Sequence, residues 1–176
     1  KQSNFFGIYP NSRNYLNDNL TNEEVFGLEA GYGFRTSKFN ANVNVYRTSW
    51  KNRFLSTSDK SKIGTTTTDE NPNGYFSFSG VSETHQGVEL DFNYKPMDKL
   101  VFNGMFSIGD WFYNGNATST RYTATNDLFG GGSKVMYWDK AKVGNSAQTT
   151  ASIGATYEVV TTVKFDANYR YSEKLY

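Results

Sequence analysis

The sequence predicts an all-β fold in which amphipathic strands follow one another as an antiparallel up-and-down meander. Two observations support this prediction. Apolar and polar residues alternate with a period of two in six segments of the 176-residue chain, as they do in strands that have two different faces. The composition also favours strands over helices, because 30 residues are aromatic whereas Leu, Ile and Val together number 23.

The first three predicted strands each place apolar side chains on one face. The first runs from 26 to 35, and the second runs from 39 to 46 with three asparagines on its opposite face. The third, from 76 to 95, is the longest. The apolar positions are Phe26, Leu28, Ala30, Tyr32 and Phe34 in the first strand, Phe39, Ala41, Val43 and Val45 in the second, and Phe76, Phe78, Val88, Leu90, Phe92 and Tyr94 in the third.

The last three predicted strands repeat this pattern at 100–109, 147–157 and 163–171. Val101 and Met105 interrupt the polar face of the fourth strand, whereas Ser, Thr, Asn and charged residues fill the polar faces of the other two. The apolar positions are Leu100, Phe102, Phe106 and Ile108, then Ala147, Ala151, Ile153, Ala155 and Tyr157, and finally Val163, Phe165, Ala167, Tyr169 and Tyr171.

Short and long connections alternate along the chain. The connections at 35–38, 96–99 and 159–162 are short, whereas those near 51–74 and 114–143 are long and polar. In an antiparallel meander, this order places every tight turn at one end of the sheet and every long loop at the other. Structureless loops of this length are unusual in compact soluble domains and are expected in outer-membrane barrels.

The apolar face therefore has two possible surroundings, the second sheet of a soluble sandwich or the lipid of a membrane. Aromatic residues gather near the strand ends, as they do at membrane interfaces, and the polar face is rich in Asn, Gly, Thr and Ser rather than in Lys and Glu. Both features favour the membrane barrel. Six strands are too few to close one, so we expect residues 1–23 to be a preceding loop and 24–176 to be part of a larger barrel.

Charge and cysteine content exclude several other classes of protein. A net charge of +1 gives no electrostatic drive for nucleic-acid binding, and the lack of cysteine excludes disulfides and thiolate metal sites. No apolar run is long enough for a transmembrane helix, and the first residues do not read as a signal peptide.

Several segments resemble the barrel of TonB-dependent receptors from Bacteroidetes. The resemblance is carried by EAGYGFR at 29–35, NVNVYRTSWKNR at 42–53, GVELDF at 87–92 with PMDKL at 96–100, KVGNSAQTTA at 142–151 and ANYRY at 167–171. It covers roughly 24–176 and corresponds to the later part of the barrel. No plug and no TonB box are recognisable. The last residue, Tyr176, is aromatic as in a final barrel strand, but Glu173 stands where alternation requires an apolar residue, so we expect a section from within the barrel.

The resemblance implies a fold, a location and partners. Such receptors have a barrel of about 22 strands around a plug, lie in the outer membrane, and import large nutrients with energy passed on by TonB. The expected partners are outer-membrane lipid, the TonB complex through the plug, the imported molecule and, in some cases, a surface lipoprotein. The resemblance does not distinguish a siderophore, vitamin, glycan or peptide as the imported ligand, and it implies no cofactor.

Aromatic residues near the long-loop ends are the candidate ligand-binding residues. They could stack on a sugar ring or hold an apolar ligand, although an aromatic girdle at the membrane or packing within the loops is the simpler explanation. Arg170 or Asp166 on the polar face could instead contact the plug. The candidate ligand-binding residues are Trp50, Trp111, Tyr113, Tyr137 and Trp138, with Phe112 beside them.

No catalytic or metal-binding residue is predicted. His85 is the only histidine, and no nucleophile motif lies near it. Glu89 and Asp91 share a strand face, but any two strand residues at that spacing do. The segment 69–74 matches the opening of a calcium loop, yet Gly80 stands where the bidentate Glu should be.

Two functions therefore remain. The first is a barrel segment of an outer-membrane importer that performs no covalent chemistry. The alternative is a soluble extracellular β-sheet module that binds glycan through its aromatic loops.

Overall fold

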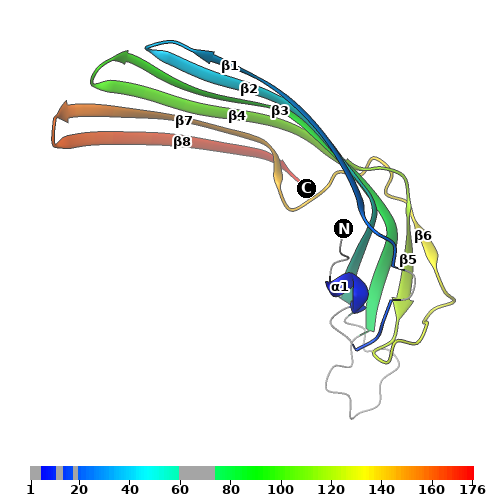
Figure 1. Ribbon diagram of the computed structural model, residues 1–176. Helices are drawn as coiled ribbons and strands as arrows, with labels where there is room; N and C mark the ends of the chain where they lie inside the picture. Colours follow the sequence, from blue (N-terminus) through cyan, green and yellow to red (C-terminus); the bar gives the residue numbers. More distant parts are fainter. Residues whose placement is uncertain (1–4, 11–13, 18–19, 60–73) are drawn as a thin grey trace. The chain divides into compact units, whose positions relative to one another are not determined.

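The computed structural model describes residues 5–10, 14–17, 20–59 and 74–176, and these residues form an antiparallel sheet with one short helix (Figure 1). The elements are α1 (Phe5–Ile8), β1 (Glu24–Arg35), β2 (Phe39–Asp59), β3 (Gly74–Met97), β4 (Leu100–Tyr113), β5 (Ala117–Tyr122), β6 (Lys134–Met136), β7 (Ala147–Val160) and β8 (Val163–Leu175). The prediction of an all-β antiparallel fold is confirmed.

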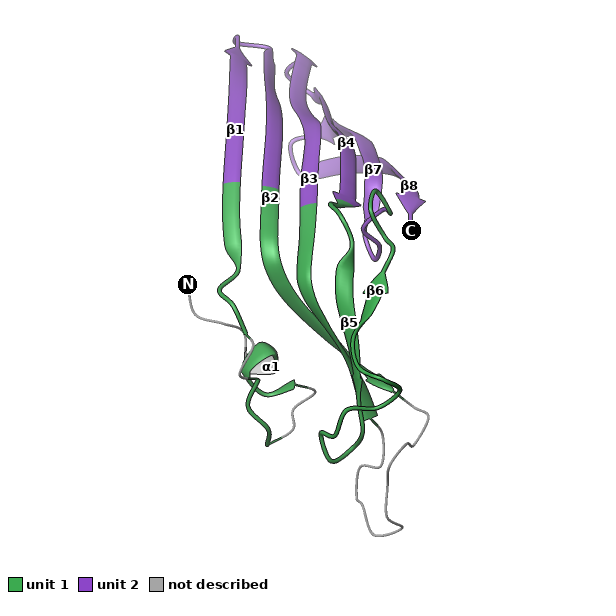
Figure 2. Cartoon of the chain, turned by 90° about the vertical axis from the view of Figure 1, so that its right-hand side faces the viewer, with its two compact units in different colours: residues 1–26, 49–83, 113–141 green, residues 27–48, 84–112, 142–176 purple. Residues whose placement is uncertain are grey.

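The main path of the sheet runs β1-β2-β3-β4-β7-β8, so each of the six predicted strands neighbours the next one along the chain. β5 pairs with β3, and β6 pairs with β5. The chain divides into two compact units (Figure 2). Unit 1 comprises residues 1–26, 49–83 and 113–141, and unit 2 comprises residues 27–48, 84–112 and 142–176.

The second strand is longer than predicted, because β2 continues to Asp59. The alternation of polar and apolar residues changes near Asn52, which has a φ of 57°. A left-handed residue within a strand shifts the alternation by one position without ending the strand. The predicted start of the loop at residue 51 is therefore too early, because residues 51–59 belong to β2. Residues 60–73 of the predicted loop lie outside the described residues.

The third strand contains a similar irregularity at Gly80, whose φ is 70°. Phe78, before it, packs on the ring of Trp138, which stacks on Tyr113. Glu83, after it, forms an ion pair with Arg53 of β2. Gly80 thus separates the predicted apolar positions Phe76 and Phe78 from those between Val88 and Tyr94.

The second long loop, 114–143, is not structureless. Its first part forms β5, which pairs with the beginning of β3 from Tyr75↔Tyr122 to Ser79↔Thr118. β6 then pairs with β5. Gly115, with a φ of 73°, separates β4 from β5 in the chain. These two strands were not predicted; β5 reads ATSTRY and lacks apolar alternation.

Buried apolar residues lie in unit 1. Among the described residues they are Tyr75, Val81, Ala117 and Ala124, and the rings of Tyr75 and Tyr122 stack with their centroids 4.9 Å apart. Two ion pairs accompany this core, Arg53–Glu83 and Arg121–Asp59. Within the described part of the chain, no helix is long and apolar enough to cross a membrane.

Candidate functional site

The strands of unit 2 expose a continuous apolar face. The register of β4, β7 and β8 aligns their apolar positions in rows, among them Leu100↔Tyr157↔Phe165 and Phe106↔Ala151↔Tyr171. Along β4 these positions extend from 100 to 108, which is about the nine residues that a tilted strand needs to cross a bilayer. The side chains face away from protein, since Tyr169 is 66% and Ile153 is 54% exposed.

Aromatic rings border this face near the short turns. Phe39 at the start of β2 contacts three other rings, with centroids 6.2 Å from Phe34, 6.4 Å from Phe92 and 6.2 Å from Tyr94. Tyr94 in turn lies 6.5 Å from Phe102. These five rings form a row across β1, β2, β3 and β4, and we call them the aromatic row. Such a row is typical of a membrane interface.

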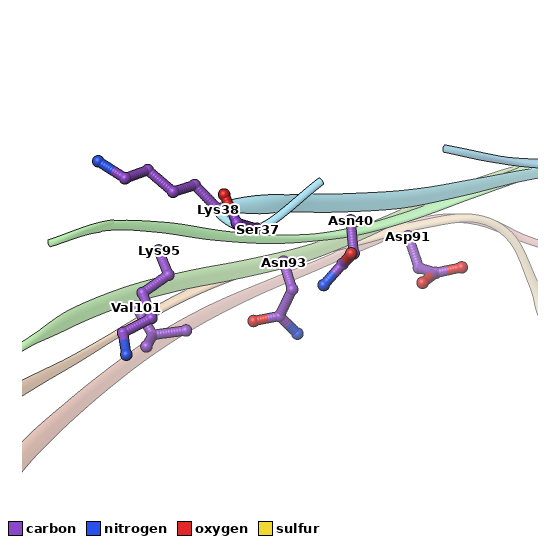
Figure 3. A pocket seen from close by; sticks show the side chains of 7 residues that line it. All are labelled: Ser37, Lys38, Asn40, Asp91, Asn93, Lys95 and Val101. Atoms are coloured by element: carbon purple, nitrogen blue, oxygen red, sulfur yellow. The ribbon is translucent and has the colours of Figure 1, made fainter. Parts of the chain in front are cut away.

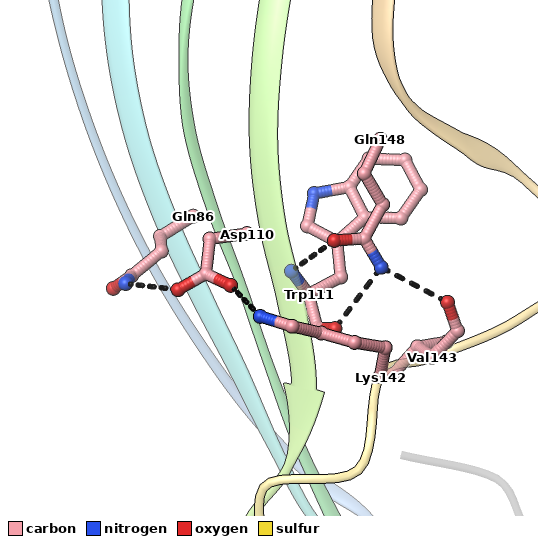
Figure 4. A network of polar contacts seen from close by, with 6 residues as sticks. All are labelled: Gln86, Asp110, Trp111, Lys142, Val143 and Gln148. Atoms are coloured by element: carbon pink, nitrogen blue, oxygen red, sulfur yellow. Dashed lines mark hydrogen bonds and ion pairs between the residues drawn. The ribbon is translucent and has the colours of Figure 1, made fainter. Parts of the chain in front are cut away.

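At the other end, polar groups replace apolar ones on the same face. Gln86 and Asp110 occupy the positions that follow Val88 and Ile108 by alternation. Lys142 forms an ion pair with Asp110, which also accepts a hydrogen bond of 3.3 Å from the Gln86 amide (Figure 4). The apolar face is therefore bounded by aromatic rings at one end and by charged and amide groups at the other.

The opposite face of unit 2 is polar, and its side chains bond to one another. The Asn42 amide donates to both carboxylate oxygens of Asp91, at 2.8 and 3.0 Å, and its oxygen accepts from Arg35 at 2.5 Å. Next to this group lies a cavity of about 330 Å³, into which Asn40, Asp91 and Asn93 project from β2 and β3 (Figure 3). A water-filled or plugged lumen would show a polar face of this kind.

A smaller aromatic cluster lies on this polar face at the far end of β4. The indole of Trp111 stacks on the ring of His85, with centroids 4.9 Å apart and planes 10° apart. Its Nε1–H donates to the Tyr46 hydroxyl at 3.0 Å. Gly87 makes room for this arrangement, because a Cβ there would lie 2.7 Å from the Tyr46 hydroxyl and 2.5 Å from the carbonyl oxygen of Ile108.

Gln148 fixes the chain at this end of β4. Its amide oxygen accepts from the Trp111 backbone N–H at 3.0 Å, and its amide nitrogen donates to the carbonyls of Trp111 and Val143 at 3.1 and 3.0 Å (Figure 4). Only 3% of Gln148 is exposed. The side chain therefore takes the place of a sheet partner where the chain returns toward β7.

Unit 1 contains a second aromatic cluster. The rings of Tyr113 and Trp138 stack with centroids 4.8 Å apart, and Phe78 packs on Trp138 at 5.6 Å. Burial raises the pKa of the Tyr113 phenol, and the negative charge of Glu83 raises it further. The hydroxyl therefore stays protonated at neutral pH and can donate a hydrogen bond.

The structure brings together only some of the predicted ligand-binding residues. Tyr113 and Trp138 are in contact, but one face of each ring is covered by the other ring and is not open to a ligand. Trp111 packs separately with His85, and Trp50 lies within β2 rather than in a loop. Tyr137, which is 85% exposed, presents most of its ring to solvent.

Sequence reasoning missed the partners of these residues. Tyr46, His85 and Gln148 lie on the polar faces of β2, β3 and β7, but only the register of the strands shows that they meet at Trp111. Among the described residues, no group of three or more acidic or histidine side chains could hold a metal ion. The calcium-like segment ending at Gly74 lies almost wholly outside the described residues.

Comparison with known families adds an independent finding. The family model described as TonB dependent receptor-like, beta-barrel matches residues 2–176, which is nearly the whole chain. No curated protein and no solved structure gives a significant match to the chain.

Proposed function

Because this chain belongs to the family of TonB-dependent receptor β-barrels, we propose that it forms part of the wall and outer loops of an outer-membrane receptor that imports a large nutrient. The family is one of receptors and transporters rather than enzymes, and it implies an outer-membrane location together with TonB and a transported ligand as partners. The chain then contributes no covalent chemistry of its own.

The observation that carries this proposal is the exposed apolar face of unit 2. Burying an apolar side chain is worth about 1.5–3 kcal/mol, and none of the large apolar side chains on this face is buried by the described part of the chain. Lipid would cover them at no cost. The polar face, with Asn42, Asp91 and Arg35 bonded together, would then line the lumen around a plug.

The same arrangement suggests the orientation. Outer-membrane barrels have short turns on the periplasmic side and long loops outside. The aromatic row near the short turns would therefore mark the inner interface, and Gln86, Asp110 and Lys142 the outer one. The long connections, including the one that contains β5 and β6, would extend outside the membrane. The backbone N–H and C=O groups along the outer edges of β1 and β8 then need hydrogen-bond partners from further strands, since lipid offers none.

The import mechanism follows from the family. Outer loops and lumen would capture the ligand, and TonB would drive a rearrangement of the plug that releases it inward. Of the aromatic residues that the sequence singled out, Tyr137 has the most accessible ring, whereas Trp50, Trp111, Tyr113 and Trp138 would act by shaping the wall. A siderophore, vitamin, glycan or peptide would suit such a receptor, and a surface lipoprotein is a further candidate partner.

The test is the location of the full-length protein and its accessibility on intact cells. We expect it in the outer-membrane fraction, with external protease cutting near Gly130–Gly132 while the turn at 97–99 stays protected. The alternative, a soluble module that binds glycan, predicts secretion and solubility without detergent. Recovery of the full-length protein as a soluble extracellular monomer would contradict the barrel proposal.

A further inference from the structure

A cavity of about 210 Å³ lies beside the β5–β6 hairpin in unit 1. Its walls are mainly apolar, from Phe76, Phe129 and Met136, and two cationic side chains, Arg121 and Lys134, also line it. The volume corresponds to about seven water molecules, which is room for one small ring. Neither of the aromatic clusters described above takes part in this cavity.

Arg121 holds the cavity wall together. Its guanidinium lies over two rings, 5.4 Å from the centroid of Phe76 and 4.8 Å from that of Phe129. Its Nε donates to the carboxylate of Asp59 at 2.5 Å, and Asp59 is almost fully buried. The positive charge of Arg121 is thus balanced by a carboxylate that does not line the cavity.

Lys134 supplies the charge that remains. It is exposed, and it has no ion pair with any residue in the described part of the chain. No carboxylate lines the cavity. The loop at its mouth consists of Gly130, Gly131 and Gly132, with φ of 76°, 86° and 89° and nothing within 4 Å of an added Cβ, so no side chain narrows the entrance there.

We propose that this cavity binds a small monoanion that carries an apolar ring, of the aromatic carboxylate class. The ring would pack on Phe129 and Met136, because apolar walls favour apolar surface. The carboxylate would lie at Lys134, whose ammonium offers three donors. This proposal depends on the proposed function in one respect, because the cavity lies in the long connection that we propose to lie outside the membrane.

The test uses the purified full-length receptor in detergent with two probes, 4-fluorobenzoate and 4-fluorobenzamide. They share a ring and differ in charge, and fluorine NMR follows both without signals from the detergent; empty micelles give the background for each probe. We expect the benzoate to bind about three to five times more tightly than the amide, as an exposed ion pair would give.

Three variants separate charge from packing. Lys134→Gln should remove the preference for benzoate, whereas Lys51→Gln, which takes a charge from an exposed position outside the cavity lining, should keep it. Met136→Ser should weaken the binding of both probes by the same factor. Equal binding of the two probes to the unaltered receptor, or a preference that survives in Lys134→Gln, would overturn the proposal. Cell fractionation tests the membrane location separately, so each idea can fail without the other.

Discussion

The ring of Phe92 lies over Gly104, in the place that a side chain at position 104 would occupy. A Cβ on Gly104 would stand 2.4 Å from Cε1 and 2.6 Å from Cζ of Phe92. Phe92 also belongs to the aromatic row, with its ring 6.4 Å from that of Phe39. A glycine covered by an aromatic ring from the next strand is a known means of pinning strand register, so this pair ties β3 to β4 within the apolar face.

The first prediction concerns the contact between Phe92 and Gly104. Gly104→Ala should lower the stability of the folded receptor by about 1–3 kcal/mol, since a methyl group forced into a filled space displaces a well-packed ring. The measurement is thermal unfolding of the full-length receptor in detergent. Gly27→Ala is the control, because a Cβ there meets only Thr48 at 3.6 Å. Equal stability of the two variants would show that Phe92 moves aside freely.

The second prediction concerns Gln148, which bonds three backbone groups at the end of β4. Gln148→Met keeps the size of the side chain but leaves the Trp111 N–H without its partner, so we expect a loss of about 2–3 kcal/mol in unfolding free energy. Gln86→Met makes a matched control, since Gln86 is partly exposed and has one long bond of 3.3 Å to Asp110. We expect that control to change stability by less than about 0.5 kcal/mol. A Gln148→Met receptor as stable as Gln86→Met would contradict the role given to Gln148.

The third prediction concerns Arg121 and the hairpin it holds. Arg121→Lys keeps the charge but loses the planar group that lies over the rings of Phe76 and Phe129, which we expect to cost about 1–2 kcal/mol of stability. Because the loss is local, external protease should cut faster near Gly130–Gly132. Arg170→Lys, at an exposed position of β8, should leave that rate unchanged. An unaltered rate in Arg121→Lys would mean that the ion pair with Asp59 alone holds the hairpin.

The six strands of the main sheet could be predicted because alternation is strict where one face is apolar and the other polar. It fails where the backbone becomes left-handed. Asn52 and Gly80 adopt positive φ within β2 and β3, and nothing in their identity separates them from asparagines and glycines in regular strands. β5 was missed for another reason, since its polar sequence becomes a strand only by pairing with β3.

The candidate site was predicted less well, because its parts meet through strand register rather than sequence spacing. Alternation alone places Tyr46, His85 and Trp111 on the polar faces of three strands. Whether their rings meet depends on how far each strand is offset from the next. The sequence therefore shows that an aromatic residue lies near a loop. It does not show whether the ring is covered, as in Trp138, or exposed, as in Tyr137.

The last prediction tests which face of the sheet meets lipid. Ile153 on β7 pairs with Gly104 and Tyr169 in the middle of the apolar face, whereas Thr150, three positions away, lies on the polar face opposite Ser107 and Ser172. An arginine on the lipid side at mid-depth destabilises a barrel by about 2–4 kcal/mol. Ile153→Arg should therefore greatly reduce the amount of folded receptor in the outer membrane, as judged by its gel mobility without heating.

Thr150→Arg should be tolerated, because the polar face can hydrate a guanidinium and its two cross-strand neighbours are uncharged. The two variants add the same group to the same strand, so a difference between them reports the face and not the residue. If Ile153→Arg folded as well as Thr150→Arg, the apolar face would not be in contact with lipid. Packing against another part of the receptor would not explain that result either, because an arginine at Ile153 would disrupt close packing. Tolerance of arginine at both positions would therefore mean that this face is exposed to water, although exposing its rows of Phe, Tyr and Ile to water is costly.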